Sequence, residues 1–176
     1  MVSDGAAALV IADAETAATL QRAIRLRARS HVNDFLPLSR RDPIEFAGAR
    51  LAWEKALAMA GISLDDLSLV ETHDCFTVAE MIEYEAMGLM PRGEGWRAIR
   101  EGLTLRNGKL PVNVSGGLKA RGHPLGATGV SQHVMVAMQL AGEAGDMQMP
   151  NVELGGVFNM GGAAVTNYVS ILERVK

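Results

Sequence analysis

The feature of the sequence that most constrains the fold is the alternation of short apolar runs with stretches of helical periodicity. Short apolar runs are typical of buried strands, whereas apolar residues at every third or fourth position indicate amphipathic helices. The predicted strands are 6–12, 22–32, 67–71, 111–114, 151–158 and 164–172, and the predicted helices are 13–20, 44–60, 77–87, 96–101 and 123–141. This order predicts a layered α/β domain with a mixed sheet flanked by helices, and five of the strands lie between residues 22 and 176.

Composition agrees with a folded domain and excludes several classes of protein. Of the 176 residues, 48% are hydrophobic and 21% are charged, which is enough apolar sequence to form a core. The net charge of -3 leaves no basic excess for binding nucleic acid. No apolar run reaches membrane-spanning length, and the first residues lack the pattern of a signal peptide. We therefore expect neither a nucleic-acid partner nor a membrane partner.

The cysteine content limits the redox and metal chemistry. Cys75 is the only cysteine, which excludes an internal disulfide and a Cys-rich structural zinc site. A lone thiol suits a reducing compartment, so we expect a cytoplasmic protein. His73 and Cys75 supply two potential metal ligands, and no second pair is spaced to complete four. No metal site is therefore expected.

The first predicted strand, 6–12, has no evident sheet neighbour in this sequence. It follows the turn signal Asp4-Gly5 and precedes a short helix that Asp13 is expected to cap. Because the backbone groups of a buried strand need partners, we expect its sheet neighbours to lie outside this sequence. For the same reason, we expect the chain to self-associate or to pair with another chain.

Polar residues at strand ends form three candidate site segments, because ligands of open α/β sheets bind at the carboxyl ends of strands. The first is His73-Asp74-Cys75-Phe76, between a strand and a helix. The dipole at a helix start lowers the pKa of a nearby thiol, which predicts a reactive Cys75. The alternative is a buried structural cysteine, the more common role of a lone cysteine.

The second segment, residues 113–129, is rich in glycine and contains His123-Pro124. Pro124 suits the first turn of the following helix, which would place His123 beside exposed backbone N–H groups. A histidine there can bind an oxyanion and transfer a proton. The alternative is a glycine-rich turn with an incidental histidine. Nucleotide binding is disfavoured, because neither Gly-x-Gly-x-x-Gly nor a P-loop ending is present.

The third segment, residues 159–164, predicts a tight turn between the last two strands. The two other histidines carry less information. His133 falls inside a predicted helix, where packing is the common role, and His31 at a strand end has no evident partner.

Taken in this order and at these separations, the three segments resemble the C-terminal half of a thiolase, over almost the whole sequence. The first segment, with Glu80 and residues 84–89, is similar to the sterol-carrier-protein type, whereas most other thiolases carry Asn-Glu-Ala-Phe there. Residues 117–129 match the Gly-His-Pro motif and its surroundings. Residues 4–8 resemble the last strand of the family's N-terminal domain. The resemblance therefore divides the chain into a remnant of that domain, 1–21, and a thiolase C-terminal domain, 22–176.

The resemblance implies an acyltransferase that forms or breaks a carbon–carbon bond of acyl-CoA. Coenzyme A is then a substrate or product, and no cofactor is covalently bound. His123 of the Gly-His-Pro motif would activate a nucleophilic cysteine and help to bind a thioester oxygen. His73 would shape an oxyanion hole, and Cys75 would transfer the α-proton of the substrate. Gly122 and Gly161 would lie near the acyl-CoA.

Two departures from the family pattern qualify this function. Most thiolases place a second cysteine in a Cys-x-Gly motif, whereas this sequence has Asn159-Met160-Gly161, which suits the sterol-carrier-protein type. The nucleophilic cysteine and the loop region that holds CoA belong to the N-terminal half of the family, and Cys75 cannot be both nucleophile and acid/base. We therefore expect the chain alone to be inactive and to need a thiolase N-terminal half.

Three alternatives stay open at this point. The chain is a non-catalytic thiolase-like subunit, part of a thiolase-fold aldolase acting on acyl-CoA side chains, or an unrelated Rossmann-like nucleotide binder. The last is disfavoured by the lack of a phosphate-binding motif.

Overall fold

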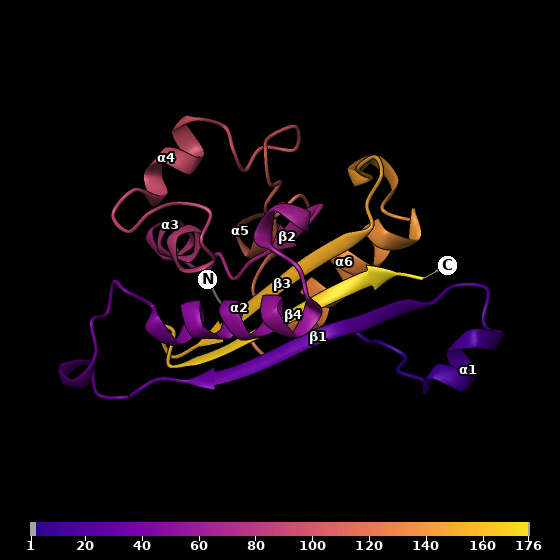
Figure 1. The fold of residues 1–176 in the computed structure, drawn as a ribbon, viewed down its shortest axis with the longest axis horizontal. Helices are drawn as coiled ribbons and strands as arrows, with labels where there is room; N and C mark the ends of the chain where they lie inside the picture. Colours follow the sequence, from indigo (N-terminus) through magenta and orange to yellow (C-terminus); the bar gives the residue numbers. More distant parts are fainter. Residues whose placement is uncertain (1–2, 176) are drawn as a thin grey trace.

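A mixed sheet forms the middle layer of the computed structural model, which describes residues 3–175 (Figure 1). The sheet has the order β1-β4-β3-β2, in which β4 is antiparallel to both its neighbours and β2 is parallel to β3. The strands are β1 (Ile24–Asn33), β2 (Leu69–Glu71), β3 (Leu154–Gly161) and β4 (Thr166–Arg174). The α-helices are α1 (Ala14–Thr19), α2 (Ala47–Ala60), α3 (Thr77–Ala86), α4 (Gly95–Arg100), α5 (Gly117–Arg121) and α6 (Thr128–Ala141). Short 3₁₀ helices are η1 (Leu38–Arg40), η2 (Leu64–Asp66) and η3 (Gly145–Met147).

Helices cover both faces of the sheet, as the sequence predicts. In Figure 1, α2 crosses in front of β1 and β4, and α6 lies behind the sheet. The buried stripe of α2 includes Trp53, whose ring centroid lies 6.3 Å from that of Phe158 on β3. Gly61 ends α2 in the left-handed conformation, with φ of 66°. The predicted helix of 44–60 is thereby confirmed from Ala47 onward.

Among residues 3–175 the sheet has four strands, so the prediction of five was wrong in number although the fold class is confirmed. The predicted strand 111–114 makes only an isolated bridge, between Val112 and Val70. Pro111 has no N–H to donate to a ladder. Asn113 has a φ of 52°, outside the extended region. The segment therefore touches β2 without extending the sheet.

The predicted strand 6–12 is also wrong, because these residues form no strand in the structure. Val10 and Ile11 are 97% and 90% exposed, so the apolar run lies on the surface. The predicted helix after it is confirmed as α1, and the carboxylate of Asp13 accepts a 2.7 Å hydrogen bond from the Thr16 N–H. No residue of α1 is buried, which agrees with its position beyond the end of the sheet in Figure 1.

The glycine-rich segment differs most from its prediction. Residues predicted as loop contain α5, and the helix predicted from His123 begins only at Thr128. Pro124 therefore lies in a turn before α6, where its carbonyl accepts hydrogen bonds from the N–H groups of Ala127 (2.8 Å) and Thr128 (3.0 Å). Among residues 3–175, no helix has the length and apolar character needed to cross a bilayer.

Candidate active site

The predicted site residues lie on one cleft of about 850 Å³ at the edge of the sheet. His73 and Cys75 follow the end of β2, Gly161 ends β3, and Gly122 and His123 follow α5. These segments lie together because the carboxyl ends of neighbouring parallel strands meet at one edge of a sheet. The cleft is lined by Ser3, His73, Asp74, Cys75, Phe76, Leu118, Lys119, Gly122, His123, Leu125, Asn159, Met160, Gly161, Gly162, Ala163, Thr166 and Tyr168.

Two histidines meet edge to face in this cleft. The ring centroids of His73 and His123 are 4.9 Å apart, and the rings are inclined by 83°. Nδ1 of His73 lies 2.6 Å from Oδ1 of Asn159, and Nδ1 of His123 lies 2.7 Å from Oγ1 of Thr128. A hydrogen bond at Nδ1 therefore fixes the orientation of each ring.

The hydrogen-bond partners define which nitrogen of each histidine carries the proton. The hydroxyl of Thr128 donates its proton to the Pro124 carbonyl at 3.0 Å, so it can only accept from His123. The amide oxygen of Asn159 likewise only accepts, so His73 donates through Nδ1. In the neutral form, both histidines then carry the proton on Nδ1 and present a lone pair at Nε2.

Burial sets the charge state of His73. Desolvation lowers the pKa of its imidazole, and the nearby His123 acts in the same direction. The hydrogen bond to Asn159 and the charge of Asp74 oppose this decrease without overcoming it. His73 is therefore mainly neutral at pH 7.

The structure corrects the predicted reactivity of Cys75. Phe76 occupies the N-cap position of α3, so the thiol lies one residue before the cap. Burial raises the pKa of the Cys75 thiol, and the carboxyl groups of Glu83 and Asp74 raise it further. The expected lowering by the helix start is outweighed, because desolvation and negative neighbours both disfavour the thiolate. Cys75 is a protonated thiol near neutral pH, a form suited to donating a proton.

Three residues that hold the site were not identified from the sequence. The hydroxyl of Ser3 accepts a 3.1 Å hydrogen bond from the N–H of His123. Thr128, on α6, contacts the ring of His123. Asp74, after the end of β2, accepts a hydrogen bond from the N–H of Leu118. Thr128 lies five residues after His123, and the sequence predicted the interior of a helix there, so its contact with His123 was missed. The contact of Ser3 joins residues 120 positions apart, and no local pattern predicts it.

The other two histidines serve the framework around the cleft. His31 stacks on Tyr168, with centroids 4.2 Å apart, and so supports one wall. His133 on α6 bonds the Gly129 carbonyl at 2.6 Å and the Ser170 hydroxyl at 3.0 Å. Among residues 3–175, no three His, Cys, Asp or Glu side chains are grouped to hold a metal ion.

The fold and the cleft define the class of protein first: a layered α/β domain with its polar groups gathered at strand ends. A solved structure of the Ltp2-ChsH2(DUF35) aldolase matches the model with a TM-score of 0.80, covering 92% of this chain and 42% of that one. At 21% sequence identity, this likeness concerns the fold alone.

Sequence comparison then gives the family. The model of the thiolase C-terminal domain-like family matches residues 30–174, and the chain belongs to that family. The predicted thiolase resemblance is thereby confirmed.

Curated relatives include both thiolases and sterol carrier proteins. The chain is 41% identical over 175 residues to the acetyl-CoA acetyltransferase of Methanothermobacter thermautotrophicus, covering 98% of this chain and 46% of the relative. It is 36% identical over 172 residues to human sterol carrier protein 2, covering 93% and 31%. It is 33% identical over 154 residues to a benzoylsuccinyl-CoA thiolase subunit of Thauera aromatica, covering 86% and 40%. The chain therefore spans less than half the length of these relatives.

Proposed function

We propose that this chain contributes the C-terminal part of the active site of a thiolase-type acyltransferase, which condenses or thiolytically cleaves acyl-CoA thioesters such as 3-ketoacyl-CoA. The observation that carries the proposal is the pair of histidines 4.9 Å apart on the cleft that Cys75 also lines. In this proposal residues 1–21 are the end of an N-terminal domain, and residues 22–176 are the C-terminal domain.

His123 has the geometry of a general base. Its Nδ1–H is held by Thr128, so its Nε2 lone pair can accept the proton of a nucleophilic thiol supplied by the N-terminal half. The resulting thiolate attacks the thioester carbonyl and forms an acyl-enzyme. The Nε2–H now present can donate a hydrogen bond to the carbonyl oxygen as negative charge develops there. The proton itself is transferred once, to the departing CoA thiolate as the carbonyl re-forms.

Cys75 and His73 act in the carbon–carbon bond step of this proposal. In cleavage, the Cys75 thiol donates its proton to the enolate carbon of the departing acyl-CoA, and the thiolate so formed accepts the α-proton in the reverse, condensing direction. His73 shapes the site of the enolate oxygen beside His123. Its Nδ1–H is held by Asn159, which fixes the orientation of the ring at this site.

The remaining parts of the proposal concern the ligand and the setting. Gly122 and Gly161 line the cleft where an acyl-CoA would approach, since glycine lets a ligand come close to the backbone. The partner is a thiolase N-terminal half or a second copy of the chain. The lone thiol favours a reducing compartment, which we take to be the cytoplasm.

The test is thiolysis of acetoacetyl-CoA with and without an N-terminal thiolase half that carries the nucleophilic cysteine. We expect the chain of residues 1–176 alone to be inactive, because acyl transfer by this route needs a covalent nucleophile that general acid/base groups cannot replace. Activity should appear with the N-terminal half and should be lost in His123→Ala. Thiolysis by the chain alone, abolished by Cys75→Ser and accompanied by acylated Cys75, would refute the proposal.

A second candidate is a thiolase-fold aldolase that cleaves β-hydroxyacyl-CoA side chains. It is favoured by the likeness in fold to the Ltp2-ChsH2(DUF35) aldolase. A partner that lacks a nucleophilic cysteine, together with aldol cleavage but no thiolysis in the paired complex, would support this candidate. A complex with neither activity would leave a non-catalytic subunit.

A further inference from the structure

We propose that Asp74 is a positioning residue whose buried carboxylate fastens the segment carrying His73 and Cys75 to the helix that leads into His123. The role of Asp74 in catalysis rests on the function proposed above. The fastening itself is a property of the chain and can be measured without a substrate.

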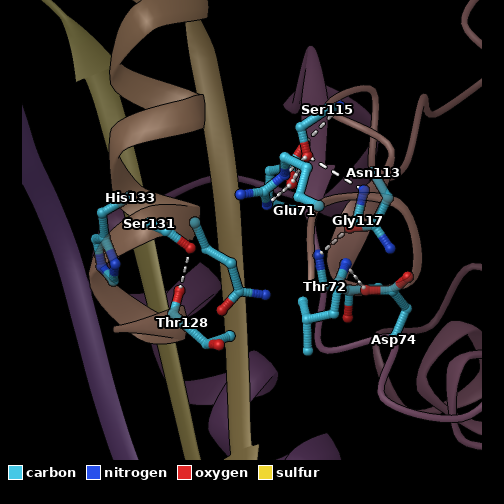
Figure 2. Close-up of polar contacts among 12 residues, drawn as sticks. Glu71, Thr72, Asp74, Asn113, Ser115, Gly117, Thr128, Ser131 and His133 are labelled. Atoms are coloured by element: carbon cyan, nitrogen blue, oxygen red, sulfur yellow. Dashed lines mark hydrogen bonds and ion pairs between the residues drawn. The ribbon is translucent and has the colours of Figure 1, made fainter. Parts of the chain in front are cut away.

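The carboxylate of Asp74 holds the start of α5 from the end of β2. Asp74 is 1% exposed, and its two oxygens accept hydrogen bonds from the N–H groups of Leu118 (2.6 Å) and Lys119 (3.3 Å). The ammonium group of Lys119 lies 3.5 Å from the same carboxylate. A buried carboxylate bonded in this way is satisfied, and charge-assisted bonds are stronger than neutral ones. Figure 2 shows Asp74 directed toward the backbone beside Gly117.

Gly117 provides the space for this contact. A Cβ atom at this position would overlap the carboxylate of Asp74, and the φ of 64° is one that other residues rarely adopt. Spatial fit and backbone conformation thus both require glycine where the carboxylate meets the helix. This close approach brings the two segments together more tightly than a side chain would permit.

The short helix transmits the position of Asp74 to His123. α5 ends at Arg121, Gly122 follows, and His123 comes next, so only a few residues separate the bonded N–H groups from the imidazole. A displacement of α5 therefore displaces His123 relative to His73 and Cys75, which flank Asp74 in the sequence. Glu71 holds the preceding turn, by accepting from the Ser115 N–H at 3.1 Å and hydroxyl at 2.6 Å (Figure 2). Its carboxylate also lies 3.5 Å from the guanidinium group of Arg121 at the end of α5.

The negative charge of Asp74 allows a second, independent test, through the pKa values of Cys75 and His73. Burial is the main cause of the raised pKa of Cys75, followed by Glu83, and the charge of Asp74 adds to the increase. For His73, burial lowers the pKa, His123 adds to this decrease, and Asp74 opposes it. Removing the charge should therefore lower the pKa of both groups.

The experiment compares three variants of the full chain by NMR and by the pH dependence of Cys75 alkylation with iodoacetamide. Asp74→Asn should lose the nuclear Overhauser contact between the His73 and His123 rings and should shift the midpoints of Cys75 and His73 downward. Gly117→Ala keeps the carboxylate but separates the segments, so it should lose the ring contact as well. Asp66→Asn is the control, since that carboxylate accepts the Ser63 N–H at 2.7 Å outside the cleft lining, and it should keep the contact and both midpoints.

A folded Asp74→Asn variant that keeps the ring contact and both midpoints would overturn the proposal. If Asp74→Asn and Gly117→Ala do not fold, the proposal is tested by amide hydrogen exchange of Leu118 and Lys119 in the chain without substitutions. Exchange as slow as in β3 and β4 supports the fastening, and exchange at the rate of an exposed loop overturns it. Thiolysis by the unmodified pair of halves is measured separately, so its failure would refute the proposed function and leave the result for Asp74 unaffected.

Discussion

At the residue scale, the chemistry of the site depends on which ring nitrogen of each histidine is hydrogen-bonded to the protein and which is free to contact a substrate. His73 and His123 are each held through Nδ1, by Asn159 and by Thr128. Neither contact was expected from the sequence, because they join residues brought together by folding or by a turn. His73, Cys75 and His123 could be selected from the sequence, through their places near predicted strand ends and the thiolase resemblance, and the structure places all three on one cleft. Their protonation states could not, because burial is not visible in a local pattern.

The lowered pKa of His73 predicts a specific dependence of stability on pH. A histidine with a folded-state pKa below its unfolded value binds more protons when unfolded, so its contribution is present above the unfolded pKa, about 6.5, and is lost as the pH falls through the folded pKa. The free energy of unfolding should therefore decrease between pH 7.5 and pH 5. In His73→Gln this decrease should be smaller, as measured by urea unfolding at several pH values. An identical decrease in the variant would contradict the assignment to His73.

The raised pKa of Cys75 predicts slow alkylation at neutral pH. Only the thiolate reacts, so the rate with iodoacetamide should be low at pH 7 and should rise with a midpoint above the usual 9.0 of a free thiol. Mass spectrometry at successive pH values measures the rate at this one cysteine. A rate of alkylation that is already maximal at pH 7.5 would show that Cys75 is a thiolate near neutral pH, as the helix dipole alone predicts.

At the element scale, elements with clear local signals could be predicted, and those fixed by distant contacts could not. The stripe of α2 and its terminal glycine are strong local signals, and that helix is confirmed. α5 is only five residues long and lies between Gly116 and Gly122, so propensity argued for a loop. Its start is fixed by Asp74, 44 positions away from Leu118, and long-range contacts of this kind override local preference. The strand expected at 111–114 was wrong because Pro111 and the positive φ of Asn113 prevent a ladder.

The packing of α2 on the sheet predicts a large loss of stability on truncation of Trp53. The side chain is 1% exposed and packs against Phe158, so Trp53→Ala removes buried apolar area and leaves a cavity. We expect the free energy of unfolding to fall by about 3–5 kcal/mol in urea titrations. Met59, on the same helix, is 63% exposed, and Met59→Ala should change stability by less than about 0.5 kcal/mol. Similar losses in the two variants would show that α2 does not pack as described.

At the scale of the whole molecule, two features bear on the association expected from the sequence. The cleft lies open at the edge of the sheet, and the one cysteine of the chain is assigned to acid/base chemistry in the proposed function. The second feature is the apolar run at 6–12, which the sequence predicted as a buried strand and the structure places on the surface. The residue pattern was interpreted in isolation as a strand, but strand formation needs a neighbouring strand, and among the described residues none pairs with it.

We therefore expect association through the exposed segment. Val10 and Ile11, 97% and 90% exposed, present apolar surface that contact with another chain would remove from water. Sedimentation velocity at micromolar concentration should detect a dimer or larger species, or a complex when an N-terminal thiolase half is added. The double variant Val10→Asp, Ile11→Asp should shift the population toward monomer, because charged side chains at this position would be costly to bury. Leu105→Asp, at a leucine that is 60% exposed elsewhere on the surface, should leave the distribution unchanged. A monodisperse monomer with ordered residues 6–12 and no affinity for the N-terminal half would refute this expectation, because the apolar segment would then be stable in water without a partner.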